Sequence, residues 1–242
     1  MFYFSFFDWT YIILIPALIF AFIAQIRVKS AFEAGNRIKT AHNITGAKAA
    51  RKILDDHGLY DISIERVGGH LTDHYDPKMG VIRLSESVYD STSAAAVGVA
   101  AHEAGHAVQY ATNYFPIRVR AAIIPVTRFG SFLAMPLFLI GLFISYFYLQ
   151  AASPISDLFM VGGIALFSFS TIFQLITLPV EFNASRRALI ILEEWGTLTV
   201  GEQQAAKNVL SAAALTYVAA LATSIAQLLR LLAIFGSRRG RR

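Results

Sequence analysis

Two histidines and a glutamate have a spacing that suits metal chemistry in the segment His102-Glu103-Ala104-Gly105-His106. In a helix, positions i and i+4 lie on one face, so both imidazoles can reach the same metal ion. Glu103 follows the first histidine and can stand beside a water molecule on that ion. Zinc lowers the pKa of such a water to about 7, and a neighbouring carboxylate can take its proton as a general base. The spacing indicates hydrolysis, with His102 and His106 as metal ligands and Glu103 as catalytic base.

The residues around this segment predict a buried helix. Small and apolar residues precede and follow it, and unpaired histidine and glutamate side chains would be costly in such surroundings. The run Ser91-Thr92-Ser93 can cap a helix that begins near Ala94 and continues to about Thr112. The alternative, a pair of surface histidines, fits these neighbours less well.

Two histidines do not complete a catalytic zinc site, which usually has three protein ligands and one open position. The chain contains no cysteine, so thiolate metal sites and cysteine nucleophiles are excluded. Glu181 directly follows Leu178-Pro179-Val180 at the end of an apolar segment. Because an acidic residue at a membrane boundary needs a partner, Glu181 is the expected third ligand. Two alternatives stay open: a histidine at position 70 or 74 as the third ligand, or no third ligand.

The composition is that of a membrane protein. Of the 242 residues, 55% are hydrophobic and only 15% are charged, whereas soluble domains carry about 25% charged residues. Segments near the length of about 20 apolar residues that a bilayer requires occur four times. They are residues 10–26, 129–149, 158–180 and 209–235, of which the last is the weakest because it contains Gln227 and Arg230.

The basic residues predict the orientation. Sixteen of the 21 lysines and arginines lie in residues 27–128 and 181–208, which the positive-inside rule places in the cytoplasm. We therefore expect a multi-pass membrane protein with its active site on the cytoplasmic side. Four spans would leave the basic tail outside, so a re-entrant fourth segment stays open. No basic run is interleaved with aromatic residues, so no nucleic-acid partner is expected.

The predicted fold is mainly α and integral to the membrane, with about four transmembrane helices and a cytoplasmic zincin-like metalloprotease domain. A turn at residues 76–80, between extended segments, predicts a small β-hairpin or sheet in that domain. The parts are an anchor (1–26), the metalloprotease domain (27–128), a transmembrane hairpin (129–180), a third-ligand helix and connector (181–208), and a C-terminal membrane helix with a basic tail (209–242).

Four motifs in the same order resemble the YugP-type bacterial membrane zinc metallopeptidases: HYDPKMGVIRLS, VAAHEAGHAVQ, LPVEFNASRRA and AAALTYVAA. The wider pattern is similar to HtpX and the CAAX prenyl proteases, in which HExxH precedes a membrane hairpin and ExxxD. The resemblance implies a gluzincin-like endopeptidase whose zinc is bound by two histidines and Glu181. Ser185 occupies the position of the aspartate, and its hydroxyl could orient a ligand histidine, more weakly than a carboxylate does.

Further site residues are predicted around this core. In zinc peptidases of this kind the substrate backbone pairs with an edge strand, and the candidate is Val81, Ile82, Arg83, Leu84 and Ser85; a hairpin that only packs is the alternative. His74 and Tyr217 could stabilise an oxyanion, although Tyr217 could equally be an interfacial tyrosine. His70, Asp73 and Asp76 suit turn and packing roles better than a second metal site. Arg186 and Arg187 are expected to anchor the third span at headgroup level.

The sequence thus predicts a membrane-embedded zinc endopeptidase with one Zn²⁺ per chain. Its expected partners are protein or peptide substrates, from membrane or membrane-proximal proteins, and the lipid bilayer. A regulatory membrane partner and a homo-oligomer both stay open. The alternative function is a proteolytically inactive membrane scaffold or assembly protein that retains a zinc site.

Overall fold

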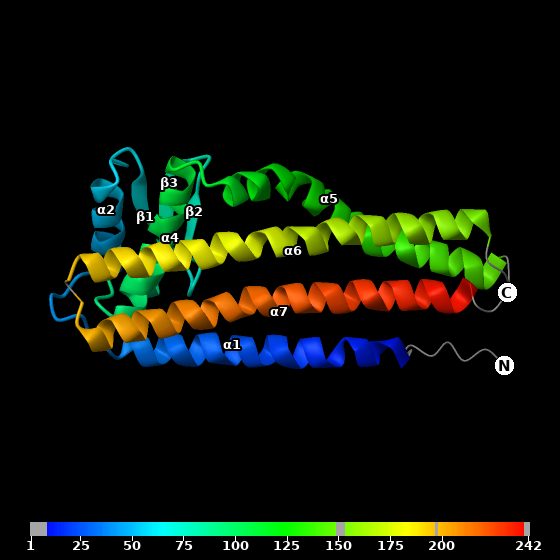
Figure 1. Ribbon diagram of the computed structural model, residues 1–242, viewed down its shortest axis with the longest axis horizontal. Helices are drawn as coiled ribbons and strands as arrows, with labels where there is room; N and C mark the ends of the chain where they lie inside the picture. The colour runs from blue at the N-terminus through cyan, green and yellow to red at the C-terminus, as the bar shows by residue number, and fades with distance from the viewer. Residues whose placement is uncertain (1–8, 149–152, 197, 240–242) are drawn as a thin grey trace. The chain divides into compact units, whose positions relative to one another are not determined.

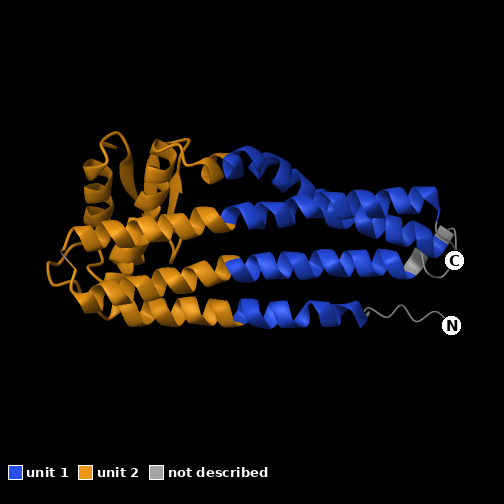
Figure 2. Ribbon diagram, in the orientation of Figure 1, with its two compact units in different colours: residues 1–22, 119–177, 218–242 blue, residues 23–118, 178–217 orange. Residues whose placement is uncertain are grey.

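The computed structural model describes residues 9–148, 153–196 and 198–239. They form two compact units (Figure 2). Unit 1 comprises residues 1–22, 119–177 and 218–242, and unit 2 comprises residues 23–118 and 178–217. Parts of the predicted 1–26 anchor, of the loop between the second and third spans, and of the basic tail lie outside the described residues. The five-part division of the sequence stays a prediction.

Long helices dominate the chain, with one small sheet (Figure 1). The helices are α1 (Ile15–Asn36), α2 (Gly46–Asp56), α3 (Glu86–Tyr89), α4 (Ala94–Ala111), α5 (Phe115–Phe143), α6 (Pro154–Glu194) and α7 (Val200–Arg239). A 3-10 turn, Trp9–Ile13, precedes α1, and a π-helical turn, Ile144–Tyr148, follows α5. The strands are β1 (Ser63–Val67), β2 (His74–Asp76) and β3 (Val81–Ser85).

Unit 2 contains the sheet, with strand order β1-β3-β2. β1 pairs with β3 in parallel, and β2 pairs with β3 in the antiparallel direction, with Tyr75 opposite Ile82. The connection from β2 to β3 is the predicted turn. Asp76 Oδ1 accepts hydrogen bonds from the backbone N–H groups of Lys78 and Met79, and Gly80 has a φ of 63°, which glycine adopts without strain.

The core of unit 2 is built around α4. Ser93 caps this helix, because its side chain accepts a hydrogen bond from Ala96 N–H, as the sequence predicts. The run of small residues allows close approach of neighbouring elements, and α4 packs against α2 and the sheet. The buried apolar residues at this centre include Ile53, Leu54, Ile82, Leu84 and Val97. The helix that carries the two histidines is therefore held on several sides.

Unit 1 is made of apolar helical segments. Within it, α5 and α6 pack closely at Gly163, where a Cβ would lie 2.6 Å from the carbonyl oxygen of Ala134. Many large apolar side chains point outward, among them Phe129, Phe132 and Leu158. Such an exposed apolar surface suits a lipid environment.

Four helical segments among the described residues are long and apolar enough to cross a membrane: Trp9–Asn36, Phe115–Phe147, Pro154–Glu194 and Val200–Ser237. The predicted mainly α membrane fold with about four spans and a small sheet is confirmed. The helices extend beyond the predicted spans, and α6 continues through Pro179 to Glu194. The sequence suggested a boundary at residue 180, because the apolar run ends there, whereas the helix itself does not.

Candidate metal centre

The two histidines lie together on α4, within unit 2. Because they are one helical turn apart, the imidazole rings of His102 and His106 meet edge to face, with 4.7 Å between their centroids. Glu103, between them in the sequence, is also buried, with 8% of its surface exposed. The capped, tightly packed helix thus holds Glu103 and His106 in buried positions and His102 in a partly buried one.

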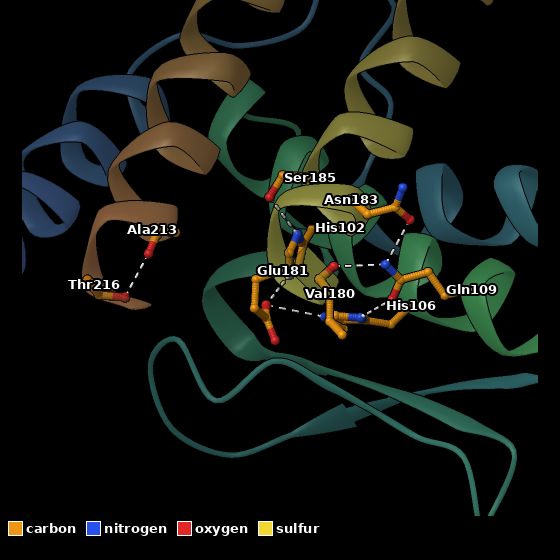
Figure 3. A network of polar contacts seen from close by, with 9 residues as sticks. All are labelled: His102, His106, Gln109, Val180, Glu181, Asn183, Ser185, Ala213 and Thr216. Carbon is orange, nitrogen blue, oxygen red and sulfur yellow. Dashed lines mark hydrogen bonds and ion pairs between the residues drawn. The ribbon is translucent and has the colours of Figure 1, made fainter. Parts of the chain in front are cut away.

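Glu181 reaches the histidines from α6 (Figure 3). Its Oε2 atom lies 3.3 Å from His102 Nε2 and 3.5 Å from His106 Nε2, and only 2% of the residue is exposed. The ligand atoms of all three residues lie within 4.8 Å of one another. Side chains about 75 positions apart in the sequence therefore converge on one point.

This donor set fits zinc. Two imidazole nitrogens and one carboxylate are typical ligands of catalytic zinc, and ligand atoms about 2.0–2.2 Å from a tetrahedral ion lie roughly 3.4 Å from one another. The separations of 3.3 and 3.5 Å between the carboxylate and the two nitrogens match that value. In the described part of the chain, His102, His106 and Glu181 are the one group of three such side chains that could hold an ion.

The remaining ring nitrogens also have partners. His102 Nδ1 lies 3.0 Å from Ser185 Oγ, and His106 Nδ1 lies 3.0 Å from Gln109 Oε1. Hydrogen bonds of this kind orient a ligand imidazole and present its other nitrogen to the metal. Ser185 thus lies within hydrogen-bond distance of His102, and its role in orienting that ring stays a prediction.

Gln109 has a place in the site that the sequence analysis missed. It is completely buried, and its Nε2 donates to Val180 O at 2.8 Å and to Asn183 Oδ1 at 3.0 Å (Figure 3). The available signal was its position three residues after His106, on the same helical face. The partners on α6, Val180 and Asn183, belong to a distant segment, so no local pattern in the sequence predicts their contact with Gln109.

The charges around His106 favour its protonated form in the metal-free site. Burial disfavours the imidazolium, but the hydrogen bond to Glu181 and the negative charges of Glu103 and Glu181 outweigh burial and raise the pKa of His106. A divalent cation can take the place of that proton, because it satisfies the same carboxylates.

The predicted edge strand is wrong. β3 is the central strand and consists of Val81, Ile82, Arg83, Leu84 and Ser85; it pairs with β1 along its whole length and with β2 over its first three residues. At Val81, Ile82 and Arg83 a neighbouring strand occupies each side of β3, so no peptide can add to the strand there. A hairpin pattern predicts only the pairing of β2 with β3. The parallel pairing of β1 with β3 is a crossover connection, which that local pattern does not reveal.

The other predicted residues lie at different places. His74 begins β2, is exposed, and has Nδ1 2.8 Å from Thr72 O. Asp73 accepts hydrogen bonds from the backbone N–H and the hydroxyl of Ser85, while His70 packs edge to face on Phe32. Asp73 and His70 therefore have turn and packing roles.

Tyr217 is half-buried on α7. The oxyanion roles of Tyr217 and His74 stay predictions.

Comparison with known proteins agrees with this centre. Residues 10–236 match the family described as "Putative neutral zinc metallopeptidase". The chain is 47% identical over 222 residues to the "Putative membrane protease YugP" of Bacillus subtilis (strain 168), a match that covers 91% of this chain and 94% of that protein. No solved structure matches the chain. The resemblance predicted from the motifs is confirmed, and this chain belongs to the family of putative neutral zinc metallopeptidases.

Proposed function

We propose that this protein is a zinc-dependent endopeptidase of the membrane. The observation that carries the proposal is the convergence of His102, His106 and Glu181, with ligand atoms within 4.8 Å, beside the buried Glu103. A structural zinc site closes all four positions with protein ligands, whereas a catalytic one keeps a position open. The described residues supply three ligands, and the carboxylate of Glu103 has a role only in an open site.

His102, His106 and Glu181 would hold one zinc ion per chain. Bound there, zinc supplies Lewis-acid chemistry, which acidifies water and polarises a peptide carbonyl. The two histidines remain neutral ligands, and the carboxylate of Glu181 offsets part of the positive charge. The hydroxyl of Ser185 and the amide of Gln109 keep the rings oriented.

Glu103 moves the proton. Its carboxylate accepts a proton from the attacking water and then donates that proton to the amine that leaves when the peptide bond breaks. Burial of the side chain keeps this carboxylate inside the site, next to the two histidines in the sequence.

An edge of the sheet can bind the substrate backbone, and β2 is the better candidate. β2 pairs only with β3 among the described strands, and Tyr75 of this strand packs on Tyr110 of α4, with ring centroids 5.8 Å apart. A peptide that adds to the outer edge of β2 would form backbone hydrogen bonds without requiring a particular sequence. β1, the other edge, lies against β3 and contacts α2 instead.

The location favours membrane or membrane-proximal protein substrates. Glu181 belongs to the same continuous helix as an apolar segment long enough to cross a membrane. The distribution of basic residues favours the cytoplasmic side for the site. A purified protein that cleaves soluble unfolded proteins as readily as membrane proteins would contradict the substrate preference.

Metal content and proteolysis, measured together in detergent, test the function. We expect the wild type to hold about one zinc per chain and to cleave an unfolded casein-like substrate. Glu103→Gln should keep zinc and lose cleavage, whereas Glu181→Ala should lose zinc. A chelator should abolish wild-type cleavage, and added zinc should restore it.

Glu194→Ala is the matched control, because Glu194 is an exposed carboxylate on the same helix. It should behave like the wild type in both measurements. If the wild type binds zinc but cleaves no more than Glu103→Gln does, the enzyme proposal fails and the scaffold alternative is supported.

A further inference from the structure

A chain of hydrogen bonds leads from Arg187 to the ligand His106, and its direction follows from what each group can do. Arg187 Nε lies 2.8 Å from Asn183 Oδ1. A guanidinium nitrogen only donates, so the Asn183 atom that faces it must be the carbonyl oxygen of the amide. Arg187 also lies 5.9 Å from the ring of Tyr114, within the range of a cation–π contact.

The same oxygen of Asn183 determines the orientation of Gln109. Gln109 Nε2 lies 3.0 Å from Asn183 Oδ1 and 2.8 Å from Val180 O, and both of these atoms are acceptors. A reversed amide would place an oxygen against two oxygens. Gln109 is fully buried, and a buried polar group without a hydrogen-bond partner is costly.

Because Gln109 Nε2 donates to two acceptors on α6, the amide oxygen of Gln109 is the atom that faces His106 Nδ1, 3.0 Å away. A carbonyl oxygen only accepts, so Nδ1 must carry a proton and the neutral ring has its lone pair on Nε2. Nε2 is the atom that faces Glu181. His102 is different, because its partner Ser185 Oγ can donate or accept and so allows either tautomer.

We propose that Arg187, Asn183 and Gln109 are positioning residues that lock His106 in the tautomer with a proton on Nδ1 and thereby hold Nε2 ready for the metal. This inference rests on the zinc site of the proposed function. It assigns Arg187 a role beyond anchoring the helix at headgroup level. Arg187 itself touches neither metal nor substrate, and acts through two intervening amides.

We call the hydrogen-bonded series Arg187, Asn183 and Gln109 the relay. Zinc affinity in detergent tests it. Gln109→Met removes both functions of the amide with little change in volume, and Asn183→Leu removes the shared acceptor. Each should weaken zinc binding by about 10- to 100-fold, the range usual for partners of ligand histidines. Asn183→Asp keeps an oxygen for both donors and should bind zinc like the wild type. Arg187→Met should weaken binding, whereas Arg186→Met, which removes the neighbouring exposed arginine, should not.

The tautomer itself gives a second readout that a purely structural role would not change. Nitrogen NMR of histidine-labelled protein, without zinc and at alkaline pH, should show the proton of His106 on Nδ1. In Gln109→Met this preference should be lost, while His102 serves as an internal reference in both spectra. A proton on Nε2 in the wild type would overturn the relay, as would unchanged zinc affinity in both Gln109→Met and Asn183→Leu.

These outcomes separate the two proposals. A wild type that shows the predicted tautomer and the predicted affinity losses, but cleaves no substrate, overturns the endopeptidase function and leaves the relay intact. A wild type that cleaves, with zinc affinity indifferent to Gln109 and Asn183, overturns the relay and leaves the function intact.

Discussion

The carbonyl oxygen of Ala184 on α6 lies where a side chain on Gly105 of α4 would begin. A Cβ built on Gly105 would be only 2.8 Å from that oxygen and 3.4 Å from the carbonyl carbon. Gly105 stands between the two histidines, and Ala184 stands one turn beyond Glu181. The missing side chain therefore allows α4 and α6 to approach closely where the three ligands meet.

Gly105→Ala should damage both the fold and the metal centre. The obstacle is backbone, which cannot rotate away, so the two helices must separate. We expect a loss of about 1–3 kcal/mol in the free energy of unfolding, typical of overpacking, together with weaker zinc binding. Thermal unfolding and zinc titration in detergent measure the two effects.

The control is Gly201→Ala, because a Cβ at Gly201 of α7 would meet nothing within 4 Å. This change should leave zinc binding intact and stabilise the helix by up to about 1 kcal/mol. Equal behaviour of the two variants would show that the approach at Gly105 is not required.

Ser185→Ala should weaken zinc binding less than Gln109→Met does. The hydroxyl of Ser185 lies 3.0 Å from His102 Nδ1, and its loss removes one contact that orients this ring. Because the hydroxyl can donate or accept, it does not fix the tautomer of His102. We expect a reduction near the lower end of the usual range, about tenfold. Zinc competition titrations on both variants give the ranking, and a larger loss in Ser185→Ala would reverse it.

The turn before β3 should make stability depend on acid pH. Hydrogen bonds from the backbone of Lys78 and Met79, together with the guanidinium of Arg83, keep the pKa of Asp76 below its ordinary value of 3.8. A carboxyl whose pKa is lowered by folding stabilises the fold above its ordinary pKa. That contribution is lost as the pH falls through the folded-state pKa.

Asp76→Asn keeps an acceptor for the backbone but cannot ionise. The wild type should exceed it in stability at neutral pH, and the difference should shrink as the pH falls below about 4. Urea unfolding of both proteins across this range measures the effect. A difference that stays constant into strong acid would exclude Asp76 as its source.

Cysteine labelling can test the side of the membrane, since the chain has no native cysteine. Met79, in the turn between β2 and β3, is 70% exposed, and Ser153 begins the described part of the chain after the second span. On intact cells, an impermeant maleimide should label Ser153→Cys but not Met79→Cys until the membrane is permeabilised. The opposite pattern would place the metal centre outside the cytoplasm.

Local patterns in the sequence determined much of this protein. The i and i+4 spacing puts His102 and His106 on one face of α4, and Ser93 marks the start of that helix, because capping and helical periodicity act over a few residues. The four long apolar segments likewise follow from length and composition alone. The sequence also singled out Glu181, as an acidic residue where an apolar run ends.

Only the tertiary structure decided which distant residues meet. The distances of 3.3 and 3.5 Å from Glu181 to the histidines depend on how α4 packs against α6, and so does the chain from Arg187 to His106. The central position of β3 depends on its pairing with β1. This pairing is a crossover connection, and the turn residues around Asp76 do not predict it. Spacing along a chain reports the contacts within one element, whereas long-range pairing and helix packing are set by the fit of surfaces that no short stretch contains.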